Sequence, residues 1–292
     1  MSWRHVWRRD LLSTYRSRLV PVVAVLLVAA TAGIVLAIYA LSPSDRPPGM
    51  RSAVFAVGAV SHALVPLAAL LASYSALIGE RESGSVRFLL GLPNSRGDAF
   101  TGKFAARLTA VGAPLAVGLG VCTAAVGALF REGSYVDMVG LTAVTLLFAL
   151  LFVGTGLALS AVVSTSTRAV VGGVGLFAVF RGGWPALQFG LLELTGADRF
   201  PVPPDWYFWV GRVNPLNAYL KLTTAYTDFG GTGHPLLTAA NDVRFEPDAG
   251  EQVVSAAGTV AVTHEFAAVV LLLWTAVVPL LGFLVWRRRD LL

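Results

Sequence analysis

The clearest chemical motif in this sequence is a glycine-rich run with the spacing of a nucleotide-binding loop. Gly97, Gly102 and Lys103 follow the pattern G-x-x-x-x-G-K, in which backbone N–H groups and the lysine hold phosphates. Phe104, however, stands where the motif needs a Ser or Thr hydroxyl to reach Mg²⁺. A Pro-Asn-Ser turn precedes the run, where the motif needs a buried strand. We therefore expect the chain to bind no nucleotide and no other cofactor.

Other catalytic and metal-binding patterns are incomplete. His264-Glu265 lacks the second histidine of the zinc motif H-E-x-x-H, and the four histidines lie far apart along the chain. The sequence contains no G-x-S-x-G nucleophile motif. Cys122 is the one cysteine, so a single chain can form neither a disulfide nor a thiolate metal site. These patterns predict neither an enzyme nor a metal site.

The composition places the chain in a membrane. Hydrophobic residues make up 55% of its 292 residues and charged residues only 13%, with a mean hydropathy of +0.70. Soluble proteins contain about 25% charged residues, so this chain cannot cover a water-exposed surface. We expect an all-α integral membrane protein with a single transmembrane domain.

Apolar runs of about 20 residues, the length that crosses a bilayer as a helix, divide the chain. The six expected spans are 19–41, 53–78, 104–130, 138–163, 169–185 and 266–286, with an interruption of the fifth at 181–185. An N-terminal segment (1–18), a charged loop (79–103) and a long segment (186–265) lie outside them.

Basic residues indicate the orientation of these spans. Most of the 22 Lys and Arg residues lie before the first span, between spans two and three, between spans four and five, or after the sixth span. Six spans place all of these short segments on the same face of the membrane. Because Lys and Arg are enriched on the cytoplasmic side, we expect both termini and the 79–103 loop to be cytoplasmic and the membrane to be the plasma membrane. An Arg8-Arg9 export signal is the weaker interpretation, because the apolar run that follows is longer than a signal h-region.

The N-terminal segment has two interpretations. Trp3, Val6, Trp7 and Leu11 recur at three- and four-residue spacing, which predicts an amphipathic helix on the inner membrane surface. The alternative is a basic flank that only fixes the topology. Within the spans, His62 is an ionisable residue and therefore a candidate for the substrate pathway, although hydrogen-bonded packing is also compatible with it.

The 79–103 loop carries seven ionisable residues between two long apolar spans. After Glu80 and Glu82, Gly84 permits a turn, and residues 86–91 are long enough for a short helix that Pro93 ends. This helix would expose an apolar ridge of Val86, Leu89 and Leu90 beside Arg87, either for a partner or as part of a solvated loop that anchors the topology. Ser95 and Asp98 have capping-box spacing, which predicts the start of the next helix.

The same loop resembles the cytoplasmic loop of ATP-binding-cassette (ABC) type-2 permeases. The residues that carry the resemblance follow the family's order: Glu80, Gly84-Ser85, Leu89-Leu90, Pro93, Ser95-Arg96 and Gly102-Lys103. The basic N-terminus, the six spans, the long segment between spans five and six and Asn214-Pro215 extend it over the whole chain. Within the family, the chain resembles the permeases of copper-enzyme (nitrous oxide reductase) maturation.

This resemblance implies that the chain is the permease of an exporter. The permease would couple to a separate ABC ATPase that carries ATP and Mg²⁺. The resemblance also implies a second permease copy or a paralogue as partner, and no nucleic acid. The implied coupling residues are Glu80, Glu82, Gly84, Val86, Arg87, Leu89, Leu90, Pro93 and Arg96. A re-entrant helical pair at 185–194 and 216–226, with Glu193, Asn214 and Pro215, would close the outer exit. A secondary transporter or channel is the alternative, but it would require polar pairs at mid-membrane.

Overall fold

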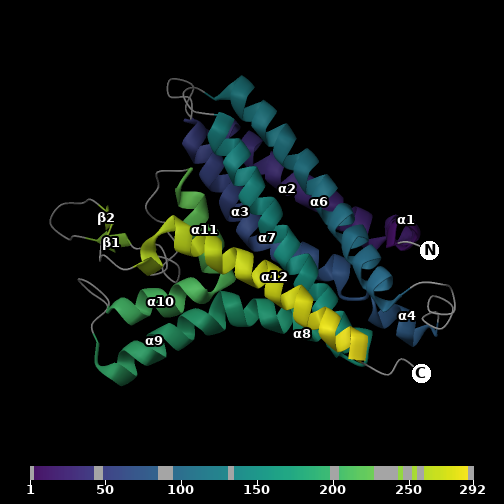
Figure 1. Cartoon of the computed structure of the whole chain (residues 1–292). Coiled ribbons are helices and arrows are strands. Elements are labelled where there is room, and N and C mark those ends of the chain that lie inside the picture. The colour runs from purple at the N-terminus through teal and green to yellow at the C-terminus, as the bar shows by residue number, and fades with distance from the viewer. Residues whose placement is uncertain are drawn as a thin grey trace.

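The structure, a computed structural model, is almost entirely helical (Figure 1). It describes residues 3–42, 49–84, 95–130, 135–197, 204–226, 243–245, 252–254 and 260–288. A short antiparallel hairpin is the exception to the helices, with strand β1 (Val243–Phe245) paired to strand β2 (Gln252–Val254). The predicted all-α class is confirmed.

Six helical stretches are long and apolar enough to cross a membrane, which confirms the predicted number of spans. They are formed by α2 (Leu19–Leu41), α3 (Met50–Ser73) with α4 (Ile78–Glu82), α6 (Arg96–Leu129), α7 (Tyr135–Val162), α8 (Ser166–Ala178) with the π turn η1 (Val179–Gly183) and α9 (Trp184–Thr195), and α12 (His264–Arg288).

Helix α7 lies at the centre of the bundle, packed against α3, α6 and α12 (Figure 1). Every residue from Leu151 to Ala158 is buried, as expected for a helix that is apolar on all sides and enclosed by other helices. A Cβ atom at Gly154 would collide with Pro279 of α12. Glycine at this position therefore lets the two helices approach closely, which is how helices commonly associate within a membrane.

The fifth span differs from the sequence prediction. The expected span ended at residue 185 after an interruption, whereas the helical backbone continues to Thr195. The π turn η1 accommodates the residues expected to break the helix, and Trp184 N–H bonds to the Val179 carbonyl across it. Pro185, in the first turn of α9, has no N–H to donate to a preceding carbonyl, and the Phe180 carbonyl five residues earlier accepts a 2.7 Å hydrogen bond from Asn214 Nδ2. Gly196, with φ of +61°, then ends the helix.

Two short helices, α10 (Asp205–Val213) and α11 (Pro215–Thr224), meet at Asn214, and the 3-10 turn η3 (Val260–Val262) precedes α12. Figure 1 shows α10, α11, the hairpin and the end of α9 on the left, whereas both termini and α4 lie on the right. Where the sequence predicted a helical pair at 185–194 and 216–226, the two adjacent short helices of the structure are α10 and α11. The sequence-predicted segment 185–194 belongs to the long fifth-span helix instead.

Candidate functional site

The predicted coupling residues lie on a stretch that the structure describes in part. Val86, Arg87, Leu89, Leu90 and Pro93 fall outside the described residues. Glu80, Glu82, Gly84 and Arg96 are described, and they flank the segment 85–94 at its two ends.

Glu80 belongs to a chain of opposite charges at this end of the bundle. Its carboxylate lies 2.8 Å from Lys103 Nζ, and the same nitrogen donates a 2.9 Å hydrogen bond to Asp10 Oδ1. Arg107 Nε lies 3.3 Å from Asp10 Oδ2. We call these four residues (Glu80, Lys103, Asp10 and Arg107) the charge cluster. The lysine of the nucleotide-loop pattern thus has carboxylate partners.

The charge cluster is buried, which makes its pairing important. The Lys103 side chain is 2% exposed, against 9% for Asp10 and 18% for Glu80. Removing one partner of a buried ion pair leaves an uncompensated charge and typically costs about 3–5 kcal/mol. The cluster draws on α1 (Trp3–Arg16), α4 and α6, so pairing its charges holds these three helices together.

Helix α1 is fixed along α6 by further contacts. Its buried residues, Val6, Asp10 and Thr14, recur every four positions and form one face. A Cβ atom at Gly102 would lie 2.6 Å from Val6 Cβ and 2.7 Å from the Trp3 carbonyl oxygen, so only glycine permits this approach. The amphipathic helix expected on the membrane surface thus has one face against the protein.

Polar groups secure both ends of α1. Trp3 N donates to Asp98 Oδ1 at 3.1 Å, and Trp7 Nε1 donates to Thr109 Oγ1 at 3.1 Å. The sequence analysis missed Asp10, although a signal was present. Asp10 is the one acidic residue in an N-terminal segment rich in arginine, and it falls on the face that carries Val6.

Glu82 fastens α4 to the fifth-span helix. Its carboxylate accepts hydrogen bonds from Ser166 N, at 2.8 Å, and from Ser166 Oγ. Arg81 Nη1 donates to the Val163 carbonyl at 3.2 Å. Glu82 therefore has an internal role at the start of α8, in addition to the partner contact expected from the sequence.

Arg96 connects the start of α6 with the end of α12. Its Nη1 donates to the Arg287 carbonyl at 2.8 Å, and Trp286 Nε1 donates to the Arg96 carbonyl at 3.2 Å. The predicted capping box is confirmed, since Asp98 N donates to Ser95 Oγ at 3.0 Å and Ser95 N donates to Asp98 Oδ2 at 3.1 Å.

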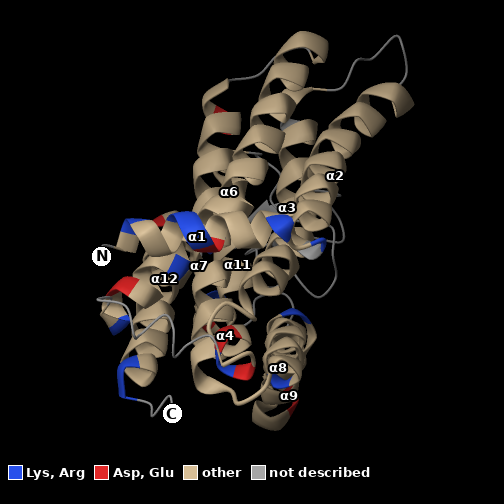
Figure 2. Cartoon of the chain, turned by 90° about the vertical axis from the view of Figure 1, so that its right-hand side faces the viewer, with Lys and Arg blue, Asp and Glu red and all other residues tan. Residues whose placement is uncertain are grey.

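These contacts make one end of the bundle a connected unit. Figure 2, which faces this end, shows Lys, Arg, Asp and Glu grouped around α1, α4 and the end of α12. We call it the charged end. The segment 85–94 begins after Gly84, where φ of +72° is a conformation that suits glycine, and it returns at the capped start of α6. The described residues on both sides of this segment are therefore held by contacts with other helices.

The other predicted site residues lie deeper in the bundle. His62 is 2% exposed, and its Nδ1 lies 2.7 Å from Arg181 Nη1 of η1. Its ring is nearly parallel to that of Tyr219, with centroids 6.1 Å apart. Tyr219 OH shares a 2.9 Å hydrogen bond with Thr145 Oγ1 of α7.

Asn214 and Pro215 adjoin this group. Asn214 Nδ2 donates to the Phe180 carbonyl within η1 at 2.7 Å, and its Oδ1 accepts from Leu216 N at 2.9 Å to cap α11. Pro215 starts α11. Glu193 is not part of this arrangement, because it lies exposed near the end of α9. We call His62, Arg181, Thr145, Asn214 and Tyr219 the mid-span polar cluster. The sequence analysis treated Arg181 only as part of a helix interruption.

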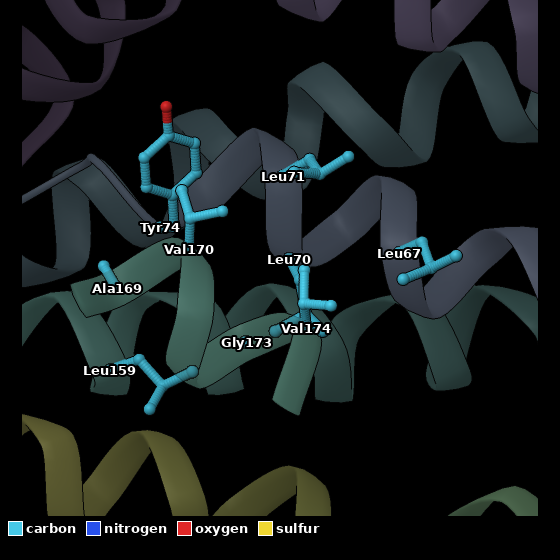
Figure 3. Close-up of a pocket in the computed structure, with 9 residues that line it drawn as sticks. All are labelled: Leu67, Leu70, Leu71, Tyr74, Leu159, Ala169, Val170, Gly173 and Val174. Atoms are coloured by element: carbon cyan, nitrogen blue, oxygen red, sulfur yellow. The ribbon is translucent and has the colours of Figure 1, made fainter. Parts of the chain in front are cut away.

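A small cavity lies between α3, α7 and α8 (Figure 3). Its volume is about 10 Å³, close to the minimum for one water molecule, so it cannot hold a cargo. The lining is almost wholly apolar: Leu67, Leu70, Leu71, Tyr74, Leu159, Ala169, Val170, Gly173 and Val174. Among the residues that the structure describes, no group of three His, Cys, Asp or Glu side chains could hold a metal ion.

Comparison with known proteins gives consistent matches. Residues 4–291 match the family described as "ABC-2 family transporter protein". A probable ABC transporter permease protein NosY of Stutzerimonas stutzeri is 25% identical over 294 residues, which cover 97% of this chain and 98% of the relative. A protein of the same description from Pseudomonas aeruginosa is 25% identical over 237 residues, covering 78% and 84% of the two chains.

Proposed function

Because the chain belongs to the ABC-2 family of transporter proteins, we propose that it is an exporter permease driven by a separate ATPase subunit. The family match and the six apolar helices identify it as a multi-pass membrane subunit of an ABC transporter. The ATPase would bind ATP and Mg²⁺, and this chain would form the substrate pathway together with a second copy or a paralogue. Both termini would lie in the cytoplasm of the cell.

The observation that carries this proposal is the burial of Lys103 between Asp10 and Glu80. These contacts tie α1 and α6 to α4, the helix that leads into segment 85–94. A force on that segment would reach the ends of several spans together, because Glu82 and Arg96 extend the connection to α8 and α12. Such a connected end is what a permease needs to convert closure of an ATPase pair into movement of its helices.

The ridge of Val86, Leu89 and Leu90 is our proposed docking surface for the ATPase. Burial of one leucine contributes about 1.5–3 kcal/mol, whereas an exposed charge pair contributes about 0–1 kcal/mol. The ridge should therefore supply most of the affinity, and Arg87 should orient the partner. The basic residues on the short segments at the charged end support a cytoplasmic location, where the ATPase would find its ATP.

A secondary transporter gains some support from one observation. The contact between Arg181 and His62 is a polar pair within the spans, of the kind that such transporters require. The ABC-2 family match over residues 4–291 nevertheless favours the ATPase-driven mechanism. The two mechanisms differ in one measurable respect, since only the ATPase-driven mechanism requires an ATPase in the purified complex.

The test is purification of the tagged chain from its native host in mild detergent. The complex should contain an ATPase subunit and show vanadate-sensitive ATP hydrolysis. Leu89→Asp combined with Leu90→Asp should remove both, because charge replaces the apolar ridge. The same change at the paired leucines of the expected outer segment, Leu236→Asp with Leu237→Asp, should leave both in place. An ATPase that stays bound to the Leu89/Leu90 variant would show that this ridge is not the docking surface.

A further inference from the structure

Arg181 occupies an unusual place in the fold. It lies near the middle of the 30-residue fifth-span helix, within the π turn that separates α8 from α9. Its side chain is only partly buried, and the neighbouring Gly182 and Gly183 are exposed. A guanidinium is therefore presented at the surface of the subunit, far from both ends of the span.

The contacts of Arg181 leave its charge in place. A guanidinium only donates hydrogen bonds, so His62 Nδ1 must accept, and the imidazole is the neutral tautomer. The neutral imidazole of His62 orients the Arg181 guanidinium by a hydrogen bond and does not neutralise its positive charge. No ion pair within the described ranges includes Arg181.

The surrounding backbone fixes the position of the guanidinium. In the π turn, Trp184 N–H donates a hydrogen bond to the Val179 carbonyl, and Asn214 Nδ2 donates one to the Phe180 carbonyl at 2.7 Å. The turn is thus braced by the junction between α10 and α11. Single π turns within α-helices occur frequently at functional sites.

The positive charge of Arg181 in the middle of the span limits which environment this surface can have. Charged side chains within membrane spans are rare, and they almost always face the interior of a bundle or a water-filled cavity. Arginine can also extend to the headgroups, but only from positions near a helix end. Arg181 is neither enclosed nor near an end, so its surface should contact water.

We propose that the surface around Arg181 lines the transport pathway and binds an anionic group of a water-borne cargo, such as a carboxylate, phosphate or sulfonate. The planar guanidinium suits oxyanions because two parallel N–H groups can bind two oxygens at once. His62 takes one donor and sets the orientation, which leaves other donors for the cargo. This inference rests on the proposed function and adds a chemical class of substrate to it.

The test measures the reaction of a cysteine beside Arg181 with charged thiol reagents. Gly182→Cys is suitable because a Cβ atom there meets no atom within 4 Å. Cys122→Ser removes the one native cysteine. The full chain in phosphatidylcholine nanodiscs, open on both sides, is treated with a methanethiosulfonate carrying either a sulfonate or a trimethylammonium group.

Gly182→Cys should react with both reagents and faster with the sulfonate. Arg181→Gln should lower the ratio of the two rates by on the order of fivefold, as expected for the loss of one charge a few ångströms away in water. Arg181→Lys should keep the preference. Leu272→Cys, an exposed position on α12 expected to face lipid, should react with neither reagent.

Two results would overturn the inference. One is a Gly182→Cys thiol as unreactive as the Leu272→Cys thiol, which would place the surface in lipid or in a closed interface. The other is loss of the sulfonate preference when phosphatidylglycerol replaces part of the phosphatidylcholine, which would assign the anion site to lipid headgroups. The reaction needs no ATPase, so absence of an ATPase from the purified complex would contradict the proposed function alone.

Discussion

At the scale of residues, Lys103 is the point on which the charged end depends. Its sequence context has the spacing of a phosphate-binding loop, yet its ammonium group lies between two carboxylates. Because Phe104 lacks the hydroxyl that would reach Mg²⁺, we expected no nucleotide binding from the sequence, but the spacing could not identify Asp10 as the partner of Lys103. That contact joins residues 93 positions apart, and it depends on how α1 lies along α6.

Replacement of Lys103 should destabilise the protein strongly. Lys103→Met leaves Asp10 and Glu80 buried without the ammonium between them, so we expect the free energy of unfolding to fall by about 3–5 kcal/mol. Thermal unfolding in detergent would measure the change. Arg168→Met removes an exposed cation from the start of α8 and should have little effect.

A second comparison separates charge from packing. Asp10→Asn with Glu80→Gln in the Lys103→Met background removes the uncompensated carboxylates, so this triple variant should recover part of the lost stability. If Lys103→Met and Arg168→Met unfold at the same temperature, the charge cluster does not hold the three helices together.

At the scale of elements, hydropathy predicted the spans well and their interruptions poorly. A run of about 20 apolar residues leaves few structural choices in a bilayer, so the six helices follow from the sequence. The fifth helix was predicted too short, because glycine and proline at 182–185 indicate a break. In the structure the helix continues through these residues by way of a π turn, and Asn214 donates a hydrogen bond to the Phe180 carbonyl of that turn. This contact is long-range, so the local sequence does not predict it.

The close contact of α1 with α6 gives a prediction for Gly102. Gly102→Ala places a methyl group 2.7 Å from the Trp3 carbonyl oxygen, so α1 should move away from α6. Trypsin should then cleave faster after Arg16, at the end of α1, in detergent-solubilised protein. Gly79→Ala is the matched control, since the nearest atom to its Cβ would be 3.8 Å away. Equal cleavage rates for the two variants would show that α1 is not held by this contact.

At the scale of the whole molecule, the two ends of the bundle differ in chemistry. The charged end gathers the basic N-terminal helix, α4 and the C-terminal arginines of α12 (Figure 2). The opposite end carries α10, α11 and the hairpin (Figure 1). The sequence analysis predicted this division because the positions of the basic residues along the chain can be read without any knowledge of packing. It could not predict the mid-span polar cluster, whose members come from α3, α7, η1, α11 and the junction between α10 and α11.

Orientation in the membrane tests the central claim most directly, because an ATPase can drive this permease only from the cytoplasm. In a Cys122→Ser background, exposed Ser83 beside α4 and exposed Thr195 at the end of α9 are changed singly to cysteine. Intact cells are then treated with a membrane-impermeant maleimide. Thr195→Cys should be labelled, and Ser83→Cys should be labelled only after the cells are opened. Labelling of Ser83→Cys in intact cells would place the charged end outside and contradict the account.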